Sequence, residues 1–146
     1  MVKSSKWIDV LSLILSSILI TIGMESLRVS GERDYSHMLI ETAMMSLSFL
    51  VILFAFRKRE RIFNIPPIVF TVLLGLSLWL ICHSILGVFL DWKYISAHPE
   101  NAFDRHLQVF QALLIFIPVF AIITFGIVLI MRLIAYTIAN QKSSLK

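Results

Sequence analysis

Residues 107–131 have the sequence LQVFQALLIFIPVFAIITFGIVLIM, which contains no charged side chain in 25 positions. A bilayer has a hydrocarbon core about 30 Å thick, and about 20 helical residues are enough to cross it. This stretch is therefore long enough and apolar enough to span a membrane as one helix. Helix-forming residues follow it and Asn140 is a suitable stop, so we expect the helix to extend to about residue 139.

Three further apolar stretches precede this one. Asp9 and Glu25 enclose 15 uncharged residues, and residues 38–56 form a run broken only by Glu41. Residues 62–90 are uncharged at 29 positions, which is more than one span needs. Pro66 and Pro67 place the start of that helix, because proline fits the first helical turn and not the interior. We expect the three spans at about residues 7–24, 38–56 and 66–90.

The composition agrees with a membrane protein. Hydrophobic residues make up 58% of the chain and charged residues 15%, whereas a soluble domain has about 45–50% and about 25%. We therefore predict an all-α polytopic membrane protein, with residues 1–146 forming a single four-helix transmembrane domain. The first span lacks good cleavage chemistry near residues 21–23 and is expected to remain as a signal anchor. Cys82 is the one cysteine, so no intrachain disulfide can form.

The placement of charge predicts the orientation. With the amino terminus inside, the inner segments hold nine basic and two acidic residues, and the outer segments hold four basic and seven acidic ones. Lysine and arginine are retained on the cytoplasmic side of membrane proteins. Both termini are therefore expected to face the cytoplasm. The short loops and the composition favour a bacterial inner (plasma) membrane.

Each predicted span carries at least one polar residue at a similar depth near its outer end. These residues are Thr21, Glu41, His83, Gln108 and Gln111. Ionisable groups at membrane depth are costly and are candidates for function, so Glu41 and His83 could form a proton or ligand site. The alternative is a hydrogen-bond network that holds the helices together, with each bond worth about 0.6–2 kcal/mol.

Metal binding is not expected, because Glu41 and one histidine supply too few ligands. A weaker alternative would combine Asp104 and His106 with His98 and His37 from the outer loops. No cofactor is expected either. A haem enzyme with His83 as an axial ligand lacks a second axial candidate, and no catalytic motif occurs in the chain.

The densest charge cluster is RKRER at residues 57–61. It is sufficient as a topology determinant. It could also dock anionic lipid headgroups or the acidic face of a cytosolic partner, together with Arg132 near the end of the last helix. The docking residues are therefore predicted to be Arg57, Lys58, Arg59, Arg61 and Arg132. Direct nucleic-acid binding is not expected, since the cluster lacks interleaved aromatic residues.

Two further features concern the packing of the helices. Pro118 lies near the middle of the last span and removes a backbone donor, so it predicts a kink that could act as a hinge. Small residues recur four apart, as at Ser12 and Ser16 or Thr71 and Gly75, and allow close helix packing. Four helices also expose much apolar surface, so we expect a homo-oligomer in the lipid bilayer.

A resemblance to known proteins rests on four features of the chain. These are its length, its inward termini, the basic connection FRKRERIFN at residues 56–64 and its small extramembrane mass. In architecture the chain resembles the small four-span membrane subunits of bacterial anti-phage systems, such as the exclusion protein RexB and the Kiwa membrane subunit. Colicin immunity proteins are about equally similar. The anti-phage resemblance implies a membrane sensor or pore-like effector that works with a cytosolic protein partner, and it identifies no functional residue.

Two hypotheses follow for the function. The first is a non-enzymatic, homo-oligomeric membrane subunit that senses or scaffolds at the membrane and docks a cytosolic partner through its basic inner face. The second is an ion or proton channel or transporter subunit that uses Glu41 and His83.

Overall fold

The computed structural model describes residues 6–26, 35–57, 66–90, 96–97 and 99–144. All of these residues except 66 and 96–97 belong to four long helices: α1 (Lys6–Ser26), α2 (Tyr35–Arg57), α3 (Pro67–Leu90) and α5 (Pro99–Ser144). All four are long and apolar enough to cross a membrane, and the described ranges contain no strand. The predicted all-α fold with four membrane-spanning helices is thus confirmed.

The ends of the helices differ from the predicted spans where polar residues continue an apolar helix. α3 begins at Pro67, next to the predicted start at 66. α2 begins at Tyr35, three residues before its apolar run, and this difference brings His37 into the helix. α5 begins at Pro99, where proline fits the first turn, and continues to Ser144. The hydropathy of a segment therefore locates the span and not the ends of the helix.

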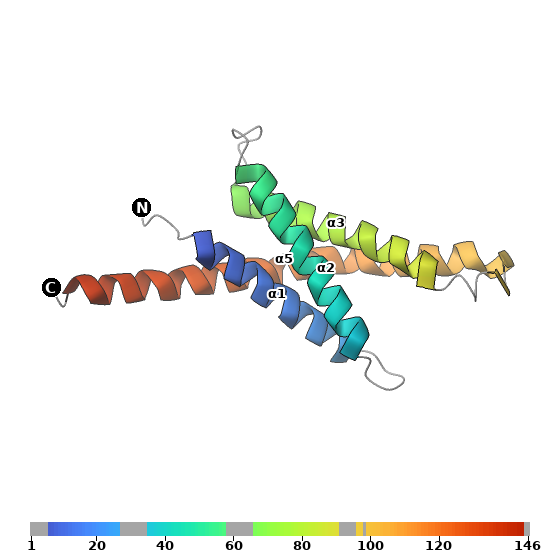
Figure 1. The fold of residues 1–146 in the computed structure, drawn as a ribbon, viewed down its shortest axis with the longest axis horizontal. Helices are drawn as coiled ribbons and strands as arrows, with labels where there is room; N and C mark the ends of the chain where they lie inside the picture. Colours follow the sequence, from blue (N-terminus) through green and yellow to red (C-terminus); the bar gives the residue numbers. More distant parts are fainter. Residues whose placement is uncertain (1–5, 27–34, 58–65, 91–95, 98, 145–146) are drawn as a thin grey trace.

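The helices form a ring in which each one packs against two others (Figure 1). α1 packs against α2 and α5, and α3 packs against the same two helices, whereas α1 and α3 do not meet within the described ranges. In Figure 1, α3 lies alongside the first half of α5 and α1 crosses the middle of α5. The start of α1 and the end of α5 lie toward the same side of the molecule.

α1 directs its small hydroxyl residues inward, together with Leu13 and Ile20, and most of its other large apolar residues outward. Ser12, Ser16, Ser17 and Thr21 are buried, while Leu11, Leu15, Ile18, Leu19 and Ile22 are exposed. Each of the four hydroxyls donates to the backbone carbonyl oxygen four residues earlier, at 2.6–2.9 Å. The hydroxyls therefore need no partner on another helix. A helix with this inverted pattern is suited to lipid, where small residues allow close helix packing.

The α2–α3 interface is closed by Gly75 of α3 against the fully buried Phe49 of α2. A Cβ atom at position 75 would lie 2.9 Å from Cε1 and 3.2 Å from Cα of Phe49, and it would also meet Cδ1 of that ring. Glycine is therefore required here by the close approach of the two helices.

Replacing Gly75→Ala should destabilise the protein by about 1–3 kcal/mol, the usual cost of overpacking a core, because the enclosed Phe49 ring must move. Gly126→Ala is the matched control, since a Cβ there would meet nothing within 4 Å. Reversible unfolding in detergent micelles measures both variants. Equal stability of the two would contradict the close packing at Gly75.

Candidate functional site

A cluster of ionisable side chains lies at the end of the bundle where α1 ends and α2 begins. Glu25 is the second-last residue of α1, and His37 and Glu41 lie in the first two turns of α2. Positions four apart share one face of a helix, so His37 and Glu41 face the same neighbours. His83 of α3, seven residues before Leu90, completes the group. Three helices thus contribute to one place.

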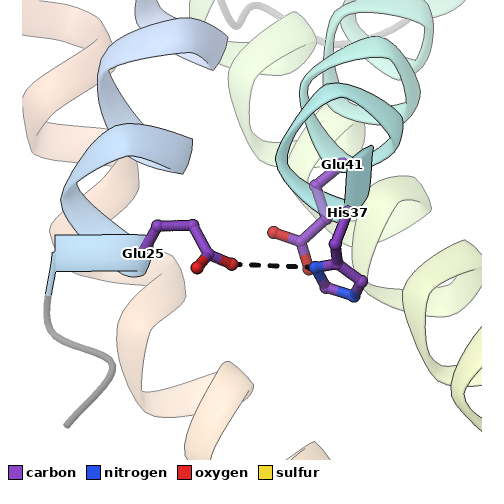
Figure 2. Close-up of side chains that lie close together, drawn as sticks. All are labelled: Glu25, His37 and Glu41. Atoms are coloured by element: carbon purple, nitrogen blue, oxygen red, sulfur yellow. Dashed lines mark ion pairs between the residues drawn. The ribbon is translucent and has the colours of Figure 1, made fainter. Parts of the chain in front are cut away.

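Glu41 is the centre of this cluster, and its residue is only 4% exposed. Its Oε1 atom lies 3.0 Å from Nδ1 of His83 and 3.8 Å from Nδ1 of His37. The same His37 atom lies 3.7 Å from Oε1 of Glu25. Figure 2 shows Glu25 extending from α1 toward the His37 ring, beside the carboxylate of Glu41.

Aromatic side chains continue from the cluster toward the centre of the bundle. The ring of Trp79 lies 5.6 Å from the ring of His83 and 6.0 Å from that of Phe120 on α5, measured between centroids. Trp79 is fully buried, and its Nε1–H has no hydrogen-bond acceptor among the described residues. The His37 and His83 rings meet edge to face, with centroids 6.5 Å apart. His83 is therefore held between Trp79 on its own helix and the polar groups of α2.

The electrostatics of the cluster favour a positive charge. Glu25 and Glu41 place two carboxylates next to each other in a region where little water can separate them. At low dielectric, like charges repel strongly and a cation between them is strongly attracted. A bound cation would supply that charge. The arrangement can therefore bind a cation as well as hold the helices together.

The structure brings some of the residues predicted for the intramembrane cluster together and separates others. Glu41 and His83 are in contact. Thr21 is buried on α1, one turn before Glu25, and its hydroxyl donates to the carbonyl oxygen of Ser17. The side chain of Gln108 lies outside the described residues.

The side chain of Gln111, also predicted for the intramembrane cluster, is exposed in this single chain. At 3.6 residues per turn, position 111 is rotated roughly 140° from Thr124 on α5. Thr124 is fully buried, so Gln111 lies on the opposite side of the helix. Pro118 is also exposed, and α5 remains helical through it. The hinge at Pro118 stays a prediction.

Sequence reasoning missed Glu25 and His37 as members of this cluster. His37 was assigned to an outer loop because the apolar run begins at Met38, yet the helix begins at Tyr35. The sequence signal that could have found His37 is its four-residue spacing from Glu41. This spacing places both residues on one helix face when the helix begins before residue 37. The expectation of no metal site counted only Glu41 and His83. The structure instead places a ligand atom each from Glu25, His37 and Glu41 within 4.8 Å of one another.

A second charged contact lies near the opposite end of α1. Arg132 of α5, predicted for partner docking, directs its Nε–H and Nη2–H to Oδ1 of Asp9, at 3.2 Å and 3.0 Å. The Asp9 side chain is 7% exposed and that of Arg132 is 43% exposed. Arg132 therefore links α1 to α5 and still has an exposed portion. The other docking candidates, Arg57 through Arg61, lie outside the described side chains.

The two charged contacts lie near opposite ends of α1. Asp9 and Glu25 are 16 residues apart on α1, which is about 24 Å along a helix. That distance is close to the hydrocarbon core of about 30 Å, given that long side chains reach toward the surface. The ion pair and the cluster are therefore well separated along the bundle.

Replacing Arg132→Met should lower stability by about 1–2 kcal/mol, less than the loss of a partner in a fully buried pair, because Arg132 is partly exposed. Asp9→Asn and the double variant complete a thermodynamic cycle, and we expect the two losses not to add. Lys6→Met, on the exposed side of α1, is the control and should have little effect. Additive losses, measured by unfolding in micelles, would contradict a direct coupling.

Comparison with known proteins gives no relative for this chain. No family model matches it, and no curated protein or solved structure is significantly similar to it. The chemistry of the described side chains is therefore the guide to function. Among these side chains, the cluster around Glu41 combines burial, several ionisable groups and contributions from three helices.

Proposed function

We propose that this chain is an integral membrane protein that binds cations at the Glu41 cluster and acts as a channel or transporter subunit. The observation that carries the proposal is the contact of 3.0 Å between the buried Glu41 carboxylate and the His83 imidazole. These groups come from different helices inside a bundle whose outer surface is apolar. Ion pathways through membranes are lined by such groups.

The main rival is a purely structural network. The bundle already has ways to hold its helices together, namely small hydroxyl residues on α1 and the close approach of Gly75 to Phe49. Neither requires an ionisable group. Two carboxylates and two imidazoles in one place are more than packing needs, and their hydration is lost at some cost. This excess supports an ionic function for the cluster.

The proposed setting is the inner membrane of a bacterium, with both termini in the cytoplasm. The distribution of lysine and arginine supports this orientation. The Glu41 cluster then lies near the outer face of the bilayer, and the Asp9–Arg132 pair lies near the inner face. An ion arriving from outside would meet the cluster first.

Glu41→Gln should lower cation flux into proteoliposomes at least tenfold, because it removes the charge and keeps the shape of the side chain. His83→Ala should lower the flux as well. Gln111→Ala is the control, since Gln111 is polar and exposed on α5. Fluorescent reporters for monovalent ions, divalent ions and protons measure the flux, and size-exclusion profiles establish that each variant is folded. Unchanged flux in both cluster variants, or no wild-type flux above empty liposomes, would reject the proposal.

A second candidate function concerns the predicted inner end of the bundle. α5 has 46 residues, so it is about 69 Å long, more than twice the hydrocarbon thickness. It continues for 12 residues beyond Arg132, and the side chains of Leu133, Ile134 and Tyr136 there are exposed. We propose that this segment and residues 57–61 dock a cytosolic protein on a non-enzymatic, homo-oligomeric sensor or scaffold. The resemblance to anti-phage membrane subunits supports such a partner.

Changing Arg57, Lys58, Arg59 and Arg61 to Ser and Gln should abolish recovery of the cytosolic partner with the detergent-solubilised protein. The remaining basic residues on the predicted inner side preserve the orientation. Lys93→Gln with Arg105→Gln is the matched control on the predicted outer side. One partner retained by the wild type and the control but lost from the variant, together with loss of phage protection, supports docking. Retention of both in the basic-cluster variant would exclude it.

A further inference from the structure

We propose that Glu25, His37 and Glu41 form a binding site for a divalent transition metal ion, for which Zn²⁺ is the natural probe. The proposal rests on the proposed cation-binding role of the Glu41 cluster and names the class of cation. Each of the three residues offers one ligand atom, and these three atoms lie within 4.8 Å of one another. The ligands come from the end of α1 and the start of α2.

The distances are close to those of a metal centre. Two ligands at about 2.1 Å from a tetrahedral zinc ion are about 3.4 Å apart. Nδ1 of His37 lies 3.7 Å from Oε1 of Glu25 and 3.8 Å from Oε1 of Glu41. Small side-chain rotations would therefore bring the three atoms to coordination distance. Because His37 and Glu41 are on one helix face, the backbone already fixes two of the ligands.

The ligand types select the class of metal. One imidazole nitrogen and two carboxylate oxygens suit zinc and its neighbours in the first transition row, whereas calcium and magnesium prefer oxygen ligands alone. A divalent ion would also be attracted by the two carboxylates, whose side chains are 10% exposed for Glu25 and 5% exposed for Glu41. Three protein ligands leave a fourth position open, as in sites where a metal ion exchanges ligands.

The surroundings would hold the ligands in place. Nδ1 of His83 lies 3.0 Å from the Oε1 atom of Glu41, so His83 is a positioning residue for that carboxylate. Groups that contact a metal ligand orient it and tune its affinity. The fully buried Trp79 packs against His83, and its Nε1–H has no acceptor among the described residues. Trp79 thereby holds the imidazole of His83 beside the Glu41 carboxylate.

The test is zinc binding by the purified full-length chain in detergent, after removal of the affinity tag and of metals with a chelator. We expect one Zn²⁺ per chain by calorimetry and by elemental analysis after dialysis. Glu25→Gln and His37→Ala should each weaken binding at least tenfold, while His83→Ala should weaken it less. Ca²⁺ should bind at least tenfold more weakly than Zn²⁺.

A second measurement separates loss of the site from loss of the fold. Zn²⁺ should raise the thermal midpoint of the wild type, since a ligand stabilises the state that binds it. In Glu25→Gln and His37→Ala the rise should disappear while the midpoint without metal stays unchanged. Asp104→Asn with His106→Ala is the matched control and should keep the rise. Zinc binding that is lost in this control and kept in Glu25→Gln and His37→Ala would overturn the proposed ligands.

The result also distinguishes this inference from the proposed ion pathway. Zinc binding that depends on Glu25 and His37, without any flux in proteoliposomes, would uphold the metal site and reject the pathway. Flux that depends on Glu41, in a protein that does not bind Zn²⁺, would uphold the ion pathway and reject the metal site. Binding with the same affinity in all variants would show adventitious metal and would overturn the inference.

Discussion

The packing of α1 into the bundle is the constraint on which the rest of the structure depends. In lipid, helices gain little from burying apolar side chains, so their association needs close van der Waals contact. α1 meets this need by burying Ser12, Ser16 and Ser17, whose hydroxyls are satisfied by their own backbone. This packing brings the end of α1 against α2, and Glu25 therefore meets His37. The position of the cluster is a consequence of the small-residue face.

The fold was largely predictable because lipid, as the surrounding solvent, permits few backbone structures. Four long apolar runs leave an all-helical membrane bundle as the solution that satisfies every backbone group in lipid. Pro67 marked the start of α3, since proline has one favourable place in a helix. The other helix ends were less predictable. Tyr35 and Ser36 are compatible with both loop and helix. The hydropathy of a segment does not show at which residue the helical backbone hydrogen bonds begin.

The only part of the candidate site that could be predicted was the contact between residues at a similar depth in the membrane. Glu41 and His83 lie at similar distances from the ends of their spans, and they meet. Gln111 met the same depth criterion and is exposed, because rotation about the helix axis decides which side faces the bundle. That rotation depends on which neighbours α5 packs against. The contacts of Glu25 and of Arg132 depend in the same way on tertiary packing, which a single sequence does not contain.

The two charged contacts of the bundle differ in a way that separates structure from function. Asp9 and Arg132 form a pair of opposite charges, in which two donors meet one acceptor oxygen. The cluster around Glu41 instead contains two acidic groups and two imidazoles, and imidazole is neutral or cationic depending on its surroundings. The cluster also places one possible metal-ligand atom each from Glu25, His37 and Glu41 within 4.8 Å of one another, and for this reason we assign the ionic function to the Glu41 end of the bundle.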